Sequence, residues 1–320
     1  MAALTPELLQ TLRQQFPPFG GGVQSSSALQ LFCEFYGVDF STRLPSVEHV
    51  TGLVHSGEYT LAVHHWCQPD ATANLLLVHG YFDHTGVFSK LIEWGLSCRY
   101  NVLIFDLPGH GLSSGESAVI DDFSDYSRAI SDVLRAVSLP SLPLWTMAQS
   151  TGCAALVDYA SKYPWPFAAS VLLAPLIRPV RWKRVKAACL LLKNVVDSLP
   201  RKFSPNSSDR QFQRFLISDP LQSQRISLRW VSALRRWLSQ LRCDDLGVGP
   251  ALIVQGDADA TVDWRYNVGV VRQLFPASHV EYLPGAGHHL ANESDKIRSS
   301  YLRLVENWLS KSGIGQGGAQ

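Results

Sequence analysis

The chain has 320 residues, of which 46% are hydrophobic and only 17% are charged. This composition is typical of a well-packed globular protein and excludes a disordered one, and the length accommodates one large α/β domain with an insertion or two small domains. The formal net charge of +1 gives no whole-chain reason to expect nucleic-acid binding, and we predict none.

Residues 1–47 are a predicted helical N-terminal extension, because apolar residues recur at helical spacing in 5–16 and 26–37. This start carries the acidic Glu7, no apolar core and no basic leader, so we expect no signal peptide. The longest apolar runs of the chain fall well short of the roughly 18 residues that a membrane-spanning helix needs. We therefore expect a cytoplasmic protein that contacts membranes only peripherally. Six scattered cysteines without metal-like spacing predict free thiols.

From residue 48 onward, short apolar or β-branched runs bounded by turn residues predict strands. They lie at 48–55, 58–66, 74–79, 101–106, 142–147, 169–174, 250–255 and 279–283, with helix-period segments at 85–98, 121–138, 151–163, 265–275 and 294–311. The first two runs alternate polar and apolar residues around Ser56-Gly57, which predicts a hairpin. The later runs are apolar almost throughout, as in strands covered by helices on both faces. The alternation of strands and helices predicts an α/β fold with a mostly parallel, doubly wound sheet.

Residues 176–245 interrupt this alternation with helical stretches and no strand pattern, and we interpret them as an inserted helical cap. The segment has 15 Lys and Arg against five Asp and Glu, whereas the rest of the chain has 13 against 22. A cap near +10 thus lies on a body near −9, an asymmetry that the total charge hides. The predicted core comprises 48–175 and 246–311, and we expect 312–320 to be a disordered tail.

Residues 145–160, WTMAQSTGCAALVDYA, lead from a predicted strand through a turn into a predicted helix. A strand followed at once by small-x-Ser-x-Gly and a helix is what a nucleophile elbow requires, because strand and helix pass so closely that the flanking residues must be small. Ala148 and Gly152 meet this requirement on either side of Ser150. The five residues alone are equally compatible with a serine that caps a helix.

The stretch 75–86 ends a predicted strand at His79-Gly80, and the following loop can turn backbone N–H groups toward the top of the sheet. An oxyanion hole needs two such donors, and we assign them to Tyr81 and Thr151. We expect His79, Gly80 and Gln149 to contact the substrate beside them. A generic strand-to-helix turn would explain the glycine but not the His-Gly pair.

Three further loops carry candidate acids and bases. In 105–115, the surrounding glycines favour a rigid loop over a direct chemical role for Asp106 and His110. A serine hydrolase on such a sheet orders its residues as Ser, acid and His, at the carboxyl edge of the strands. The later loops offer Asp257, Asp259 and Asp263 as acids and His288 and His289 as bases. The residues alone do not choose between these neighbours.

Together, the segments HGYFDHTG, FDLPGHGLSSG, AQSTG, QGDAD and PGAGHH resemble the α/β-hydrolase fold. Within that fold they are similar to the branch of monoacylglycerol lipases and lysophospholipases, also called serine-aminopeptidase-like hydrolases. The resemblance covers roughly 50–311 and implies the α/β-hydrolase fold with a helical cap insertion. The branch typically reads HG-x-x-[DE]-H, which Asp83 and His84 match, and it carries a cap motif S-D-P-L, present here at 218–221.

The resemblance also selects the partners of the candidate nucleophile. In that family the acid is the fourth residue of G-x-x-D, which points to Asp259, and the catalytic histidine ends G-A-x-H, which points to His288. The chain departs from the family at Ala148-Gln149, where Gly-His is usual. This departure leaves Ser150 as the nucleophile and makes the pocket floor beside it less predictable.

The elbow residue limits the reaction. Dehalogenases and epoxide hydrolases on this fold use an aspartate at the elbow, whereas this chain has Ser150. The adjacent pairs His64-His65 and His288-His289 lack the spacing of metal ligands, so we expect neither a metal ion nor a cofactor. The predicted chemistry is hydrolysis of a carboxylic ester by two-step acyl transfer through an acyl-Ser150 intermediate.

The predicted cap indicates the substrate class. Segments 181–199 and 225–241 combine basic residues with apolar faces, and Trp230 and Trp237 share one face that we expect to be buried. The few cap carboxylates disfavour a peptidase, which must hold a free amino terminus. We expect monoacylglycerol or lysophospholipid as substrate, with a cap that packs on the core and also contacts anionic membrane. The alternatives are a carboxylesterase or thioesterase for small acyl groups, and a ligand-binding protein without turnover.

Overall fold

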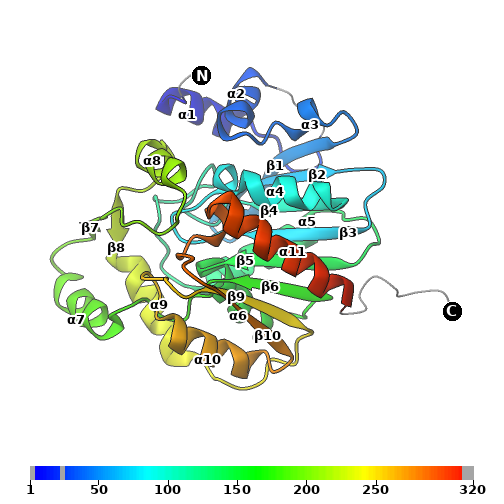
Figure 1. Ribbon diagram of the computed structural model, residues 1–320. Coiled ribbons are helices and arrows are strands. Elements are labelled where there is room, and N and C mark those ends of the chain that lie inside the picture. Colours follow the sequence, from blue (N-terminus) through cyan, green and yellow to red (C-terminus); the bar gives the residue numbers. More distant parts are fainter. Residues whose placement is uncertain (1–3, 22–25, 312–320) are drawn as a thin grey trace.

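The computed structural model describes residues 4–21 and 26–311, so the predicted tail at 312–320 lies outside the described residues (Figure 1). An eight-stranded sheet runs through the centre in the order β1-β2-β4-β3-β5-β6-β9-β10. The strands are β1 (Glu48–Ser56), β2 (Tyr59–Cys67), β3 (Ala73–Val78), β4 (Tyr100–Phe105), β5 (Leu144–Gln149), β6 (Ala169–Leu173), β9 (Ala251–Gly256) and β10 (Ser278–Leu283). Each predicted strand is therefore present within two residues of its expected bounds.

The strand pairing confirms the predicted mostly parallel sheet. β1 and β2 form the expected antiparallel hairpin around Ser56-Gly57, and β2 also runs antiparallel to β4. All other neighbours, from β4 to β10, are parallel. The carboxyl ends of β3, β5, β9 and β10 consequently meet at one edge of the sheet, where ligands bind in folds of this kind.

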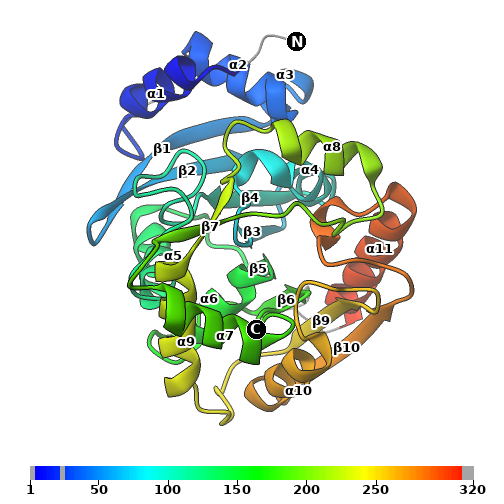
Figure 2. The same cartoon turned by 90° about the vertical axis from the view of Figure 1, so that its left-hand side faces the viewer.

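Helices cover both faces of the sheet, as Figure 2 shows. Along β3, Leu75 and Leu77 belong to one buried cluster and Leu76 and Val78 to the other, because successive side chains of a strand point to opposite faces. The first face is covered by α4 (Ser89–Ser97) and α11 (Asp295–Lys311), and the second by α5 (Ser124–Ala136), α6 (Thr151–Ala160) and α10 (Trp264–Leu274). The short 3-10 turn η1 (Thr85–Phe88) directly precedes α4, and the 3-10 turn η2 (Leu290–Asn292) precedes α11.

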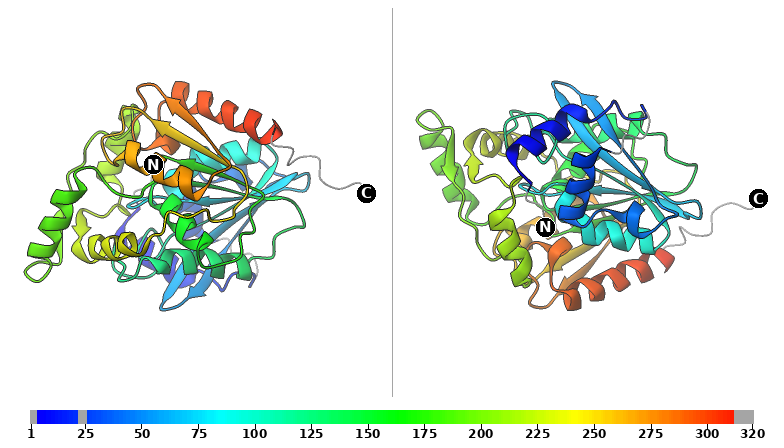
Figure 3. Two further views of the ribbon diagram at one scale, coloured as in Figure 1. Left: turned by 90° about the horizontal axis from the view of Figure 1, so that it is seen from below. Right: turned by 90° about the horizontal axis from the view of Figure 1, so that it is seen from above.

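The N-terminal extension forms the two expected helices, α1 (Pro6–Gln15) and α2 (Ser27–Tyr36), followed by the short α3 (Phe40–Arg43). Thr5 and Ser26 cap α1 and α2 by accepting hydrogen bonds from backbone N–H groups three residues later. Leu12 and Phe32 are buried against the first face of the sheet. Seen from above in Figure 3, these helices lie over the edge that β1 and β2 form.

The segment 176–245 contains α7 (Trp182–Leu192), α8 (Arg210–Ser218) and α9 (Leu228–Gln240). It also contains a two-stranded antiparallel ladder of β7 (Ser198–Pro200) and β8 (Arg225–Ser227), which corrects the prediction that no strand occurs here. Each of these strands has only three residues, too few to give an alternating pattern. The expected helices over 181–199 and 225–241 are accordingly shorter, and Ser227 caps α9 through the N–H groups of Arg229 and Trp230.

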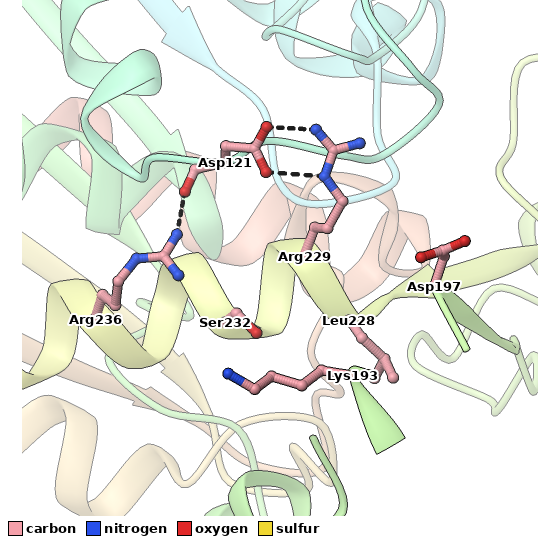
Figure 4. Close-up of a pocket in the computed structure, with 7 residues that line it drawn as sticks. All are labelled: Asp121, Lys193, Asp197, Leu228, Arg229, Ser232 and Arg236. Atoms are coloured by element: carbon pink, nitrogen blue, oxygen red, sulfur yellow. Dashed lines mark hydrogen bonds and ion pairs between the residues drawn. The ribbon is translucent and has the colours of Figure 1, made fainter. Parts of the chain in front are cut away.

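Helix α9 fixes this segment to the core. The Nε1 groups of Trp230 and Trp237 donate to Tyr126 Oη (3.1 Å) and Asp158 Oδ1 (3.0 Å), so both tryptophans are buried on one face as predicted. Figure 4 shows Asp121 between two arginines of α9: Arg229 Nε donates to its carboxylate over 2.8 Å, and Arg236 donates to its backbone carbonyl. A small pocket of about 200 Å³ lies at this joint.

Two further findings concern the cysteines and the helix lengths of the described residues. Cys33, Cys67, Cys98, Cys153, Cys189 and Cys243 are all free, as expected. Across 4–21 and 26–311, no helix combines the length and the apolar character that crossing a bilayer demands.

Candidate active site

Ser150 lies in the turn between β5 and α6 with φ 53° and ψ −113°, the strained conformation that the elbow prediction requires. A Cβ on Gly152 would lie 2.3 Å from the carbonyl oxygen of Val78, so only glycine fits where α6 passes β3. Gly80 is under a similar restriction, because a Cβ there would lie 2.8 Å from Asp83 Oδ2 and 3.4 Å from Ser150 Cβ. The turn is thus packed closely against the backbone of β3 on one side and against the loop that carries Gly80 on the other.

The structure brings Ser150, His288 and Asp259 together from three separate loops. Asp259 Oδ2 accepts from His288 Nδ1 (2.8 Å), and His288 Nε2 lies 2.9 Å from Ser150 Oγ. Since a carboxylate only accepts hydrogen bonds, the ring proton is on Nδ1 and the lone pair of Nε2 faces the serine hydroxyl. The three residues are 8%, 6% and 7% exposed, so they are largely shielded from solvent without being closed to a ligand.

The carboxylate of Asp259 is held in its ionised form. Its Oδ1 accepts from the N–H groups of Thr261 (2.8 Å) and Val262 (3.1 Å). Burial acts to raise its pKa, but the charge and hydrogen bond of His288 and the two backbone donors outweigh burial and lower the pKa below its ordinary value. An ionised acceptor at this place fixes the orientation and tautomer of the His288 ring.

The neighbouring candidates lie elsewhere. Asp257 is exposed and accepts from Gly285 N (2.7 Å), whereas Asp263 pairs with Arg178 over 2.7 Å. His289 Nε2 bonds to Asp83 Oδ1 (2.9 Å) rather than to the serine. Among the candidates that the sequence left open, the geometry therefore groups only Asp259 and His288 with Ser150.

The predicted oxyanion donors are the backbone N–H groups of Tyr81 and Thr151. Tyr81 is in the loop after β3, and Thr151 is the first residue of α6, whose N-terminal N–H groups have no partner within the helix. Neither group donates to an acceptor among the residues that the structure describes. Both residues line the same cavity as Ser150.

Two of the three predicted substrate contacts need correction, and the third has an additional partner. His79 is fully buried, donates from Nδ1 to Gly80 O (2.8 Å) and accepts at Nε2 from Leu107 N (2.9 Å), so its ring faces the core and not the cavity. Gly80 does not line the cavity and instead permits the close approach to Ser150. Gln149 does line it, but its Oε1 accepts from Ala291 N (2.8 Å), which ties the elbow to η2.

The sequence did not predict the partners in two buried hydrogen-bond networks around the site. Asp83 accepts from His289 and from Gly80 N (3.2 Å). Asp219, within S-D-P-L, accepts from His84 Nε2 (2.8 Å) and from Tyr36 Oη (2.7 Å), joining cap, core and N-terminal extension. Burial acts to lower the pKa of His84, but the charge of Asp219 outweighs it and the pKa is raised. The motifs HG-x-x-[DE]-H and S-D-P-L contain Asp83, His84 and Asp219. Their contacts join residues too far apart in sequence for any local pattern to reveal.

The Gly-rich loop after β4 is structural, as expected. Asp106 is fully buried and accepts from the N–H groups of Thr85 (2.6 Å) and Leu112 (2.7 Å). His110 Nδ1 donates to Pro108 O within the loop (2.9 Å). Neither side chain lines the cavity at Ser150.

A cavity of about 420 Å³ lies between the carboxyl edge of the sheet and the segment 176–245. Its apolar lining includes Leu176, Val180, Val185, Leu216, Ile226, Trp230 and Val231. Arg201 and Lys202 also line it, and Asp83 is its one acidic lining residue. The cavity is thus mainly apolar, with Ser150 and His288 at its core side.

Comparisons with known proteins identify the family of the chain and its similarity to solved structures. Residues 69–295 match the model of the family described as serine aminopeptidase, S33. The chain is 27% identical to the human monoglyceride lipase over 81% of this chain and 89% of that protein, and 26% identical to the monkeypox virus monoglyceride lipase homolog over 74% and 89%. Among solved structures it is similar to a soluble variant of the monoglyceride lipase of Saccharomyces cerevisiae, with TM-score 0.69 and 20% identity over 81% and 94% of the two chains. The monoacylglycerol lipase of Paleococcus ferrophilus gives TM-score 0.67 and 21% identity over 79% and 99%.

Proposed function

The chain belongs to the serine aminopeptidase S33 family and is an ester hydrolase with the α/β-hydrolase fold, and from this premise we propose that Ser150 cleaves esters of single-chain lipids. The proposed substrate is a monoacylglycerol or a lysophospholipid. The observation that carries the proposal is the chain of two contacts, 2.9 Å from Ser150 Oγ to His288 Nε2 and 2.8 Å from His288 Nδ1 to Asp259 Oδ2.

The proposed reaction has two steps. Ser150 Oγ attacks the ester carbonyl while His288 Nε2 takes its proton, and Asp259 stabilises the resulting imidazolium. The N–H groups of Tyr81 and Thr151 stabilise the oxyanion, and the leaving alcohol takes the proton back from His288 as the acyl-Ser150 ester forms. Water then attacks this ester with His288 again as base, releasing the fatty acid and restoring the Ser150 hydroxyl.

The lining of the cavity supports a lipid ester over a peptide. A peptidase that removes amino-terminal residues needs a carboxylate to bind the ammonium group of its substrate. The one carboxylate of the lining, Asp83, is already bonded to His289 and to the N–H of Gly80. The apolar residues from 176–245 instead offer a surface on which an acyl chain can be buried. The relatives named monoglyceride lipase support the same substrate class.

A substrate panel tests this proposal. We expect kcat/KM to rise with acyl length across p-nitrophenyl esters from acetate to dodecanoate, and both monoacylglycerols and lysophospholipids of long chain length to be hydrolysed. Activity confined to acetate and butyrate esters, or to acyl thioesters, would identify a hydrolase for small acyl groups. A folded protein that binds these lipids without cleaving any would be a ligand-binding protein instead.

We also propose that α7, together with residues 193–195 directly after it, contacts an anionic lipid bilayer peripherally. Leu190, Leu191 and Val195 are 46%, 77% and 76% exposed, which is unusual for side chains of this size. Exposed Lys183, Lys186 and Lys193 accompany them on the same segment, and this combination favours the surface of an anionic membrane. Co-sedimentation with vesicles should require anionic lipid and weaken as salt rises. Equal binding to neutral vesicles would contradict the proposal.

A further inference from the structure

We infer that Arg201, with Lys202 beside it, binds a phosphate group on the alcohol part of the substrate, so that the preferred ester is an anionic lysophospholipid and not a neutral monoacylglycerol. The inference rests on the proposed ester hydrolysis and names its substrate class more closely. It comes from the position and the contacts of Arg201, and from the fact that no described residue forms an ion pair with it.

Arg201 shares a cavity with the proposed reaction centre. Its side chain lines the same cavity as Ser150 and His288. The guanidinium carbon lies 3.9 Å from the ring centre of Phe82 and 4.4 Å from that of Phe203. Phe82 directly follows Tyr81, whose N–H is a proposed oxyanion donor, so the guanidinium is held against the loop that faces the scissile ester. A group a few bonds from that ester lies within reach of Arg201.

Arg201 forms no ion pair with a carboxylate among the residues described, although the charges of Asp83 and Asp219 act on it from a greater distance. Its Nη1 donates to two neutral acceptors, Gln222 Oε1 (2.8 Å) and Ser223 O (3.2 Å). Other arginines of the fold, Arg178 and Arg229 for instance, pair with aspartates. Within 4–21 and 26–311, Nε and Nη2 of Arg201 have no hydrogen-bond acceptor. These N–H groups are therefore available to a ligand in the cavity.

The surroundings of Arg201 favour an anion. Burial lowers the pKa of Arg201 to about 10, yet the guanidinium keeps its charge at neutral pH. A partly buried cation without a directly bonded counter-ion is costly, because Asp83 and Asp219 attract it only from beyond ion-pair distance while it has lost water. Lys202 adds a second cation to the lining, and Asp83 is already engaged by His289. A guanidinium fork matches the oxygens of a phosphate, and an ammonium beside it supplies a second charge.

A ratio of specificities separates recognition from a merely structural role of Arg201. The two substrates are 1-oleoylglycerol and 1-oleoylglycerol 3-phosphate, which share acyl chain and ester linkage, presented in the same neutral detergent micelles. We expect wild-type kcat/KM to be about tenfold or more higher for the phosphate ester. Arg201→Gln should lower the ratio of the two kcat/KM values by about 10- to 100-fold, and Arg201→Lys should give an intermediate ratio.

Arg214→Gln is the matched control. Arg214 lies on α8, is exposed and does not line the cavity, and its side chain donates only to Arg210 O. The variant removes the same charge from the same segment, so it reports any general attraction of the basic cap to anionic micelles. The ratio should stay at its wild-type value. Decyl phosphate should compete with substrate in the wild type, whereas inorganic phosphate at the same concentration should not.

Four outcomes would overturn the inference. They are equal wild-type kcat/KM for the two oleoyl esters, an undiminished preference in Arg201→Gln, an equal loss in Arg214→Gln, and inhibition by inorganic phosphate as strong as by decyl phosphate. If the wild type hydrolyses both esters without preference, the inference fails and the proposed ester hydrolysis stands. If the folded wild type hydrolyses neither ester, both fail.

Discussion

The carboxyl edge of the sheet and the helix α7 differ in how firmly the rest of the chain holds them. At the edge, Ser150, His288 and Asp259 are nearly buried, and each makes hydrogen bonds that fix its side chain. On α7, Cys189 is the one buried side chain, and Leu191 leaves 77% of its surface exposed. The first region is determined by packing within the chain, whereas the second presents apolar surface that the described residues leave uncovered.

This difference indicates that the carboxyl edge of the sheet and α7 have different roles. A reaction centre needs groups that stay in place, and the edge obtains this from β5, α6 and the loops after β9 and β10. A helix with little buried apolar surface contributes little to the stability of the fold and can change its contacts at low cost. We therefore expect substitutions at the edge to affect chemistry and folding strongly, and substitutions on α7 to affect surface binding and little else.

The largest expected effect is on turnover at the edge. Asp259→Asn removes the ionised acceptor that orients His288, and we expect kcat for ester hydrolysis to fall by about 10⁴-fold. Asp257→Asn is the matched control two residues away, since Asp257 is exposed and bonds only to Gly285 N, and its kcat should stay within about twofold of the wild type. Loss of turnover in Asp257→Asn with retention in Asp259→Asn would contradict the proposed roles.

The elbow is the next most sensitive position. Gly152→Val would place side-chain atoms against the carbonyl oxygen of Val78, and we expect the free energy of unfolding to fall by about 4 kcal/mol in a denaturant titration. Gly269 on α10 has open space around it, so Gly269→Ala should raise the free energy of unfolding by about 0.5–1 kcal/mol. Equal stability of Gly152→Val and wild type would mean that the strand and helix are not as close as described.

The buried pair of His84 and Asp219 gives a stability that depends on pH. His84 has a raised pKa in the folded state, so its contribution is full below 6.5, its ordinary value, and is lost as pH rises through the raised pKa. Asp219 has a lowered pKa, because the charge of His84 outweighs burial, and its contribution is present above 3.8 and lost as pH falls through the lowered value. The pair should therefore stabilise most between these two ordinary values.

Asp219→Asn tests this dependence. We expect it to lower the free energy of unfolding by about 3 kcal/mol near pH 6, with a smaller difference from the wild type at alkaline pH. Tyr36→Phe removes the hydrogen bond to Asp219 but leaves the His84 contact, so it should cost about 1 kcal/mol with little dependence on pH. A difference between Asp219→Asn and wild type that grows toward alkaline pH would reverse the assigned direction.

The smallest effect on the fold is expected on α7 and the residues directly after it, 193–195. The double variant Leu191→Ser with Val195→Ser should bind anionic vesicles about tenfold more weakly and change the free energy of unfolding by less than about 0.5 kcal/mol. Leu44→Ser, at an exposed apolar residue of the N-terminal extension, should leave vesicle binding unchanged. Binding that survives the double variant would rule out α7 as the contact surface.

The sheet could be predicted because its first two strands alternate polar and apolar residues, most of the later ones are almost entirely apolar, and all are bounded by turn residues. Ser150 was identifiable for a related reason: an elbow restricts residue size at fixed positions around the serine, and Ala148 and Gly152 record that restriction locally. The acid was ambiguous because Asp257, Asp259 and Asp263 share one loop. The base was ambiguous because His288 and His289 are adjacent. Only the resemblance to a known family chose among them, and the geometry agrees with that choice.

Several other features of the site and the fold could not be predicted from local sequence patterns. His79 ends its strand where a site residue is expected, but the sequence does not say that its ring turns into the core. The partners Asp83 and His289 are 206 residues apart, so no spacing connects them. The ladder of β7 and β8 is stabilised by pairing between two segments that are each too short to signal a strand alone. Contacts of this kind depend on the assembled fold.

The central claim is that Ser150 is the nucleophile, and reaction with a fluorophosphonate probe tests it most directly. Ser204→Ala serves as control, because Ser204 is exposed and lines the same cavity. We predict that wild type and Ser204→Ala are labelled once, on the peptide containing Ser150, and that folded Ser150→Ala is not labelled. A folded wild type that does not react, or a Ser150→Ala variant labelled like the wild type, would contradict the account.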